Sequence, residues 1–230
     1  MQSPSTIIAT DRPASETSAT HRTYLAIQNL IVTGALKPGE KLKIEGLRAR
    51  LSTGASPIRE ALSLLTSDNL VERLDQRGFR VAPTSQSNFE EILELRCDLE
   101  DRALRKSIAN RNEQWEEYVV LCHHRMTRAK QSNDPTFEAL HKAFHMALLM
   151  QCDAPILMKF CSQLYDLNIR YRYLAGSALN YTKRDVSSEH EAIMRAAISG
   201  DAESATAQLL SHYRKTGAFL ADAIAAAELP

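Results

Sequence analysis

Four histidines in the second half of the chain are the side chains best suited to chemistry. His141 and His145 are four positions apart in the stretch HKAFH, and His190 and His212 lie further along. Residues i and i+4 share one face of a helix, so the first two imidazoles would lie one helical turn apart. Neutral imidazole is a common ligand of divalent metals such as Zn²⁺ and Ni²⁺. The pattern predicts a metal site formed by His141, His145, His190 and His212.

The apolar neighbours of these histidines indicate that they face inward. His145 shares a helical stripe with Leu148, His190 shares one with Ile193, and His212 also follows apolar residues at helical spacing. A single histidine on an apolar face is more often a core residue whose hydrogen bonds are satisfied. Four inward histidines on three predicted helices favour a shared metal site instead.

A catalytic metal is a second interpretation of the same residues. A zinc protease would carry the motif HExxH, but Lys142 follows His141 where the general-base Glu would stand. Glu191 follows His190, yet adjacent residues of a helix point apart. No nucleophile stands beside a base in an evident motif, so we expect the chain not to be an enzyme.

Basic and phenolic side chains indicate an acidic ligand. Arg96 lies beside the apolar stripe of its helix; a buried arginine needs an anionic partner, and its planar fork suits a carboxylate. An internal salt bridge, for instance to Asp98 or Glu100 of a neighbouring element, is the alternative. Tyr171, Arg172 and Tyr173 could bind a second carboxylate or a hydroxyl, although such a stretch is as often an interface. We expect a small carboxylate effector at Arg96, Arg172, Tyr171 and Tyr173.

The segment that must position these residues is helix-periodic almost throughout. Asp134-Pro135 and Gly200-Asp201 mark helix boundaries, and no strand alternation is found. We predict an all-α bundle of six to seven helices over residues 88–226, preceded by a polar linker at 85–87 and followed by a short tail at 227–230. The predicted helices are 88–109, 113–131, 135–151, 155–177, 185–199 and 202–226.

The preceding segment, residues 21–84, has the pattern of a winged helix-turn-helix. An apolar stripe from Tyr24 to Ile31 predicts a first helix, and KPGEKL predicts a turn and a short extended stretch. Two short helices joined by STGAS follow, with Ser56 expected to cap the second and Pro57 at its first position. Two alternating runs around Arg77-Gly78 predict a hairpin. The fold is therefore mainly α, with one small β-hairpin.

This segment is also basic. Residues 21–84 hold ten Lys and Arg against six Asp and Glu, whereas residues 85–230 hold seventeen against twenty. A helix N-terminus carrying Ser56 and Arg59 suits the major groove of double-stranded DNA, and the other arginines would neutralise phosphates. A solvated basic face is the alternative. The predicted DNA-binding residues are Arg48, Arg50, Ser56, Pro57, Arg59, Arg77, Gly78 and Arg80.

Composition sets further limits on the class of protein. The chain is 44% hydrophobic and 24% charged, and it contains no run of 18 uncharged apolar residues, so no membrane partner or span is expected. Residues 1–20 lack the apolar core of a signal peptide and suit a disordered tail. The four cysteines form no CxxC pair, which suits reduced, buried thiols in a cytoplasmic protein.

Two stretches of the basic segment resemble a known family. IVTGALKPGEKL and SPIREALSLLTSDNLVERLDQRGFRV are similar, in order and spacing, to the DNA-binding domain of GntR-family bacterial transcription regulators. In that family the residues matching Ser56, Arg59 and Gly78 lie at the DNA. Asn69 stands where the family has a Gly that ends a helix, and Asn also tolerates the left-handed conformation. Gly54 and Ala55 offer no side chain for base contacts, so part of the usual readout would be missing or shifted.

The helical segment resembles the FCD ligand-binding domain of the FadR subfamily of these regulators. The resemblance lies in NFEEILELRCDLEDRAL, HKAFHMALLMQCDAPIL and SSEHEAIMRAAISGDAESATAQLLSHYRK. The family's metal motif matches His145, His190 and His212, but His141 stands where the family has Asp. A site of imidazoles alone would keep the full +2 charge of the ion and favour Zn²⁺ or Ni²⁺. Alternatively, His141 does not ligate and three histidines leave the site open.

The resemblance implies a regulator, most similar to the CsiR (GlaR) branch of repressors of glutarate and 2-hydroxyglutarate use. It implies a homodimer that binds a palindromic operator and a short dicarboxylate effector that binds the metal and releases the DNA. A constitutive DNA-binding dimer, whose helical domain serves dimerisation alone, is the alternative function.

Overall fold

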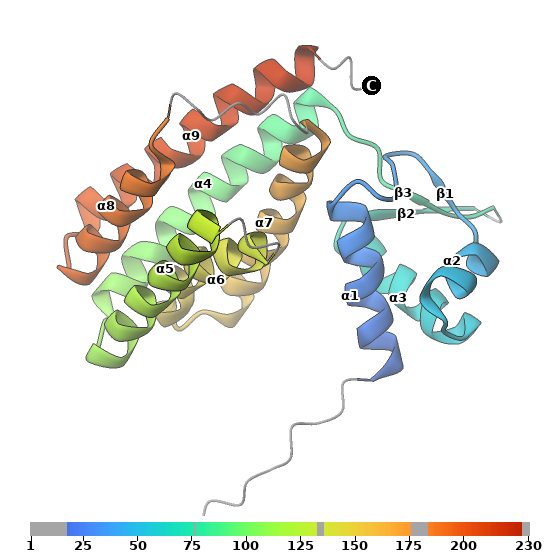
Figure 1. Cartoon of the computed structure of the whole chain (residues 1–230), viewed down its shortest axis with the longest axis horizontal. Helices are drawn as coiled ribbons and strands as arrows, with labels where there is room; N and C mark the ends of the chain where they lie inside the picture. The colour runs from blue at the N-terminus through green and yellow to red at the C-terminus, as the bar shows by residue number, and fades with distance from the viewer. Residues whose placement is uncertain (1–17, 76, 133–135, 176–183, 227–230) are drawn as a thin grey trace, which may run out of the picture.

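The computed structural model describes residues 18–75, 77–132, 136–175 and 184–226. Within these ranges the chain forms a small mixed domain followed by a helical bundle (Figure 1). The predicted tail at residues 1–17 and the predicted tail at 227–230 lie outside the described residues. Residues 19 and 20, which we expected in the tail, belong instead to the first helix because Ser18 caps it by accepting a hydrogen bond from the His21 amide at 3.1 Å.

The first domain is a winged helix-turn-helix, as predicted. Its three strands form an antiparallel sheet in the order β1-β3-β2, with Val71 paired to Val81. Gly78 begins β3 with φ 91°, a conformation that favours glycine and turns the wing. The elements are α1 (Ala19–Val32), β1 (Lys41–Leu42), α2 (Ile44–Leu51), α3 (Ala55–Ser67), β2 (Val71–Leu74) and β3 (Gly78–Val81).

The second helix of the helix-turn-helix begins earlier than predicted. Gly54, not Ser56, is the N-cap residue of α3, and Pro57 is its third residue rather than its first. The Ser56 hydroxyl donates instead to Glu60 Oε1 at 3.0 Å. The helix ends where Asn69 adopts the left-handed conformation at φ 60°, which confirms that Asn serves where relatives use Gly.

The second domain is an all-α bundle of six helices in the described residues, which confirms the predicted class and count. The predicted linker at 85–87 is shorter than expected, since Ser85 caps a helix that begins at Gln86. The third predicted helix ends in a short 3-10 turn, η1 (Met150–Cys152). The helices are α4 (Gln86–Ala109), α5 (Glu113–Ser132), α6 (Phe137–Leu149), α7 (Pro155–Ala175), α8 (Val186–Ile198) and α9 (Ala202–Ala226).

The two domains share one apolar core. Ile27 and Leu70 of the first domain belong to the same buried cluster as Phe89 of α4 and Leu167 of α7. A second cluster fills the interior of the bundle, around Phe144, Leu148 and Leu209. Figure 1 shows α1 of the first domain lying on the side of the bundle that α7 forms. No helix among the described residues is long and apolar enough to span a membrane.

Candidate functional site

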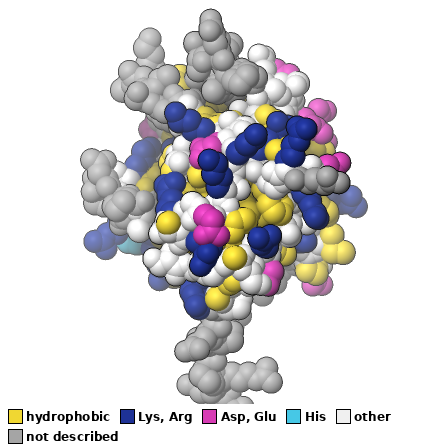
Figure 2. Space-filling view, turned by 90° about the vertical axis from the view of Figure 1, so that its right-hand side faces the viewer, with side chains coloured by type: hydrophobic (Ala, Val, Ile, Leu, Met, Phe, Trp, Pro, Cys, Tyr) yellow, Lys and Arg dark blue, Asp and Glu magenta, His cyan; other side chains and the backbone are white. Residues whose placement is uncertain are grey.

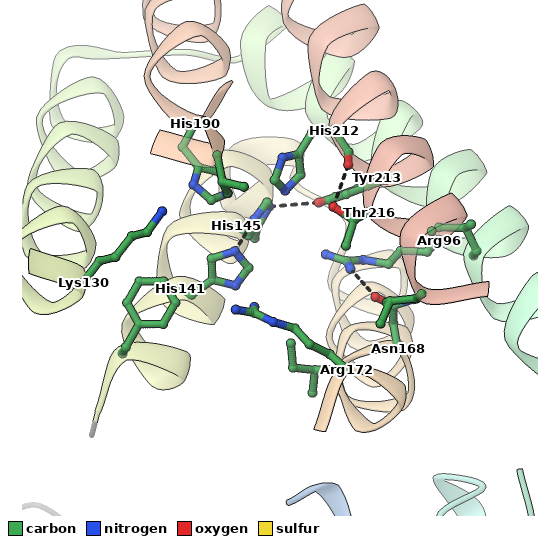
Figure 3. A pocket seen from close by; sticks show the side chains of 16 residues that line it. Arg96, Lys130, His141, His145, Asn168, Arg172, His190, His212, Tyr213 and Thr216 are labelled. Atoms are coloured by element: carbon green, nitrogen blue, oxygen red, sulfur yellow. Dashed lines mark hydrogen bonds between the residues drawn. The ribbon is translucent and has the colours of Figure 1, made fainter. Parts of the chain in front are cut away.

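The four predicted metal ligands meet inside the bundle. His141 and His145 come from α6, His190 from α8 and His212 from α9. All four are buried, and one ring nitrogen of each lies within 4.8 Å of the corresponding atom of every other. Figure 3 shows the four rings turned toward one another at the end of a pocket. The spacing in the sequence therefore predicted a true spatial cluster.

Hydrogen bonds from outside the cluster orient three of the rings. His141 Nδ1 lies 2.5 Å from the Tyr165 hydroxyl, and His145 Nδ1 lies 2.9 Å from the Tyr213 hydroxyl. His212 Nδ1 lies 2.8 Å from Glu189 Oε2. Metal-bound histidines usually have such a partner on the second nitrogen, because it fixes the ring and its tautomer. The remaining nitrogens of these rings face the centre of the cluster.

The free nitrogen atoms at the centre fit a metal ion. His190 Nε2 is buried and has no hydrogen-bond partner, and His141 Nε2 lies 3.3 Å from His145 Nε2. A buried nitrogen without a partner is costly unless another group binds it. A set of four imidazoles suits a borderline ion such as Zn²⁺ or Ni²⁺ better than an oxygen-seeking one.

Burial also keeps these histidines in the state that binds metal. Removal from water lowers the pKa of His141, His145 and His190 well below the ordinary value, and the neighbouring imidazoles add to the effect. Burial lowers the pKa of His212 too, although the hydrogen bond that the imidazole donates to Glu189 opposes it. Neutral rings keep the lone pair that a metal requires.

A cavity of about 110 Å³ extends from the histidines. Arg96, Lys130 and Arg172 reach it from α4, α5 and α7, and Figure 3 shows the three cationic groups approaching it from different sides. Leu93 and Val186 are among the apolar residues that line the rest. A cationic pocket with apolar walls suits a small anion that has a hydrocarbon body.

Arg96 forms the internal salt bridge that was the alternative to an effector contact. Its Nε donates to Glu100 Oε1 at 2.6 Å, which is an internal salt bridge within α4, and its Nη1 donates to Asn168 at 3.0 Å. The third nitrogen, Nη2, is buried and has no hydrogen-bond partner. The guanidinium also stacks 4.0 Å from the centre of the Tyr213 ring. Arg96 is thus held rigidly with one donor left for a ligand.

Of the other three predicted effector residues, one lines the cavity and two do not. Arg172 lines the cavity and pairs with Glu138 at 2.9 Å. Tyr171 points the other way, into the core shared by the domains, where its hydroxyl donates to Asn88 Oδ1 at 2.8 Å. Tyr173 is partly exposed and does not line the cavity. The helix turns by about 100° per residue, so three consecutive residues could not all face one pocket.

Sequence reasoning missed several residues of the site. Lys130, Asn168 and Thr216 line the cavity, and Tyr165 and Tyr213 hold the histidines. Only Tyr213 carried a signal, since it follows a predicted ligand in the sequence. The contacts of the others join segments far apart in the chain, which no local spacing reveals.

The predicted DNA-binding residues lie in the first domain, and most of them are exposed. Ser56 and Arg59 are exposed at the start of α3, Pro57 is half-buried beside them, and Arg77 and Gly78 are exposed in the wing. Figure 2 shows Lys and Arg side chains spread over the face that this domain presents.

Ion pairs restrain two of the remaining arginines. Arg50 is exposed on α2, Arg48 on the same helix pairs with Glu45 at 2.8 Å, and Arg80 pairs with Glu72 across the hairpin at 2.6 Å. Arg48 and Arg80 would have to share their charge between these carboxylates and phosphate.

The fold and the site define a class: winged-helix DNA-binding regulators with a helical second domain. Residues 19–81 match the model for bacterial regulatory proteins of the gntR family, and residues 91–215 match the FCD domain. The chain belongs to the GntR family of transcription regulators and carries an FCD domain. It is therefore a DNA-binding transcription regulator, in keeping with the expectation that it is not an enzyme.

Curated relatives and solved structures agree with this membership. The chain is 36% identical over 197 residues to the uncharacterized HTH-type transcriptional regulator BphR of Paraburkholderia xenovorans, covering 83% of this chain and 80% of that protein. It is 29% identical over 197 residues to the HTH-type transcriptional repressor GlaR of Escherichia coli, covering 82% and 90%. The structure of E. coli McbR/YncC superposes with a TM-score of 0.79 at 23% identity, covering 89% of this chain and 98% of that one.

Proposed function

We propose that this regulator is a metal-dependent sensor of a short dicarboxylate that represses transcription in the bacterial cytoplasm. It binds a palindromic operator as a homodimer and leaves it when the effector occupies the cavity. The observation that carries the proposal is the buried four-histidine cluster with an unpartnered His190 Nε2, beside the unpartnered Nη2 of Arg96. The likeness to GlaR, which is named as a repressor, supports repression rather than activation.

The charges around the cavity support a dianionic effector. The four imidazoles are neutral and leave the +2 charge of a bound ion intact, whereas Glu100 and Glu138 are already paired with Arg96 and Arg172. The Lys130 ammonium adds a further positive charge at the cavity. The charge of a bound ion would be buried among the histidines without a counter-ion, which is costly, so binding of carboxylates would relieve it. When bound, the ion would supply open coordination positions for carboxylate oxygens.

Different residues would bind the two carboxylates of such a ligand. Arg96, fixed by Glu100 and Asn168, would donate from Nη2 to a carboxylate next to the histidines. Arg172 and Lys130 would bind the second carboxylate from the other walls. The apolar walls would contact the carbon chain between them. A ligand shifts the protein toward release of DNA only if it binds that arrangement more tightly than the DNA-bound one.

The test is a thermal-shift screen of short mono- and dicarboxylates with and without Zn²⁺ or Ni²⁺. A ligand that binds the folded state raises the melting temperature in proportion to its binding free energy. We expect a dicarboxylate to raise it only in the presence of metal, and the double variant His190→Ala, His212→Ala to lose both responses. A double variant that still responded to metal and carboxylate like the wild type would refute the sensor site.

A further inference from the structure

Two consecutive residues of α6 contact two consecutive residues of α7. His141, in the metal cluster, bonds to the Tyr165 hydroxyl through Nδ1. Its neighbour Lys142 donates to both carboxylate oxygens of Asp166, each at 2.7 Å. The first of these contacts faces the histidines and the second faces away from them. A movement of His141 in α6 would therefore be passed to α7 at both Tyr165 and Asp166.

The same carboxylate also contacts the DNA-binding domain. Gln28 of α1 donates from Nε2 to Asp166 Oδ2 at 3.0 Å. The Asp166 side chain is 17% exposed and the Lys142 side chain 30%, so both are partly withdrawn from water. Asp166 thus joins α6, the helix that carries His141 and His145, to α1 of the other domain through an ion pair and a hydrogen bond.

Helix α1 is also connected to the middle and to the end of α3, the helix expected to read DNA. The Thr20 hydroxyl donates to Glu60 at 2.7 Å in the middle of α3. The Tyr24 hydroxyl donates to Asp68 Oδ2 at 2.7 Å at the C-cap of α3. Ile27, which precedes Gln28, is fully buried in the common core. A shift of α1 would therefore carry α3 with it.

The junction around Asp166 has room to rearrange. A hollow of about 230 Å³, lined by residues that include Tyr24, Gln28, Asp68 and Asp166, lies between α1, the end of α3 and α7. Much of the rest of the contact between the domains is packed apolar core, beside a hydrogen bond from Arg170 Nη2 of α7 to the Ala82 carbonyl at 2.5 Å. Packed cores resist continuous deformation, so a polar junction beside a hollow is where two discrete arrangements can exist.

We propose that Asp166 is the positioning residue through which occupancy of the histidine site reaches the DNA-binding domain, by way of Lys142 on one side and Gln28 on the other. The inference rests on the proposed function and adds the route of its regulation. Coupling of this kind is a free energy shared between two sites, so removing the junction should leave each site able to bind while cutting the influence of one on the other.

A bond from α7 to the start of α4, close to the boundary between the domains, provides a matched control. The Tyr171 hydroxyl of α7 donates to Asn88 Oδ1 at 2.8 Å and lies 3.2 Å from the Ser85 carbonyl, and neither contact involves α6. Tyr171→Phe keeps the ring in the core and removes these bonds. If any hydrogen bond of α7 near this boundary served equally well, this variant would lose the coupling as much as a change at Asp166 does.

The experiment measures hydrogen exchange of the α1 amides with and without Zn²⁺ in the full-length wild type, Gln28→Ala, Asp166→Asn and Tyr171→Phe. Calorimetry measures the Zn²⁺ affinity of each. In the wild type and Tyr171→Phe we expect Zn²⁺ to slow exchange in α1 by about threefold or more. In Gln28→Ala and Asp166→Asn we expect Zn²⁺ to bind within about twofold of the wild-type affinity. We expect it to have almost no effect on hydrogen exchange of the α1 amides in these two variants.

The outcomes separate the coupling from the sensor site. A merely structural role would speed α1 exchange equally with and without Zn²⁺, and so would leave the ratio unchanged. If Zn²⁺ slows α1 exchange in Gln28→Ala as much as in the wild type, the inference is overturned. Because Gln28 is only half-buried, this variant should fold and decide the question even if Asp166→Asn does not fold. A wild type that binds Zn²⁺ without any change in α1 also overturns it, whereas a wild type that does not bind Zn²⁺ refutes the proposed function itself.

Discussion

The chemistry of the histidine cluster depends on the absence of a carboxylate among its four side chains. His141 stands where the resemblance to the FCD family implies an Asp, and its Nδ1 is held by the Tyr165 hydroxyl. Glu189, the nearest carboxylate to His212, is outside the cluster. Burial would raise the pKa of Glu189, but hydrogen bonds from His212 and Arg184 hold it well below its usual range. Glu189 therefore stays ionised and orients His212.

Replacing His141 with Asp should change both the metal and the effector that the site prefers. His141→Asp adds one negative charge beside the ion, so we expect the affinity for a dicarboxylate to fall by about tenfold or more. The affinity for Mn²⁺ relative to Zn²⁺ should rise, because carboxylate oxygen suits the harder ion. Calorimetric titration of each metal, then of the dicarboxylate, measures both. Unchanged dicarboxylate affinity in a well-folded variant would contradict the charge argument.

The lowered pKa values predict how the stability of the metal-free protein depends on pH. The unfolded chain takes up protons on its histidines below their ordinary pKa of 6.5, whereas His141, His145 and His190 stay neutral in the fold. The unfolded state then binds more protons, so stability is lost as pH falls below 6.5. Between pH 7.5 and 5.5 we expect a loss of about 1 kcal/mol per histidine.

Urea unfolding of the metal-free protein at pH 7.5 and pH 5.5 measures this loss. His124→Ala removes an exposed histidine, so its free energy of unfolding should fall between the two pH values by as much as that of the wild type. The free energy of unfolding of His190→Asn should fall by less. Equal free energies of unfolding at the two pH values would show that the cluster is not neutral in the fold.

At the scale of elements, a simple apolar pattern positions α3, the helix expected to read DNA. Ile58, Leu62 and Leu65 are buried on one side, which leaves Ser56 and Arg59 exposed on the other. The helix is therefore positioned by its core face, which leaves its exposed face available for the expected DNA contacts.

The exposed position of Arg59 predicts its part in base recognition. Arg59→Ala should weaken binding to a duplex selected in vitro from a random library by about 1–3 kcal/mol, because a bidentate bond to guanine is lost. Binding to unselected DNA should fall much less. Fluorescence anisotropy measures both, with Arg195→Ala on α8 as a charge-matched control that should bind as the wild type does. Equal losses on selected and unselected DNA would assign Arg59 to phosphate contacts instead.

Local patterns predicted the helices well because periodicity and helix-ending residues are local. The six bundle helices were expected within a few residues of their observed ends, and residues 202–226 as observed. The start of α3 was misplaced because Gly54 caps it without a side chain, whereas Ser56 offered a familiar capping sequence. Tyr171 was wrongly predicted to line the pocket because α7 is buried on two sides, one facing the pocket and one facing the other domain.

At the scale of the whole molecule, the two domains are joined more closely than the sequence indicated. The predicted linker at 85–87 suggested separate bodies, but Phe89, Leu167 and Tyr171 share a core with the first domain. The four histidines could be foreseen because each lies on an apolar helical face and three of them match the spacing of one family motif. The Lys142–Asp166–Gln28 junction could not, since it joins residues 138 positions apart.

The central claim is that metal and dicarboxylate together control DNA binding, and one titration tests it most directly. Fluorescence anisotropy would measure binding of the duplex selected in vitro while glutarate and related dicarboxylates are added. The titration would be made with the Zn²⁺-loaded wild type and with the His190→Ala, His212→Ala variant. We expect at least one dicarboxylate to weaken wild-type binding by about tenfold or more, and the variant to bind DNA without responding. Operator binding by the Zn²⁺-loaded wild type that no dicarboxylate alters would contradict the claim and leave a constitutive DNA-binding dimer.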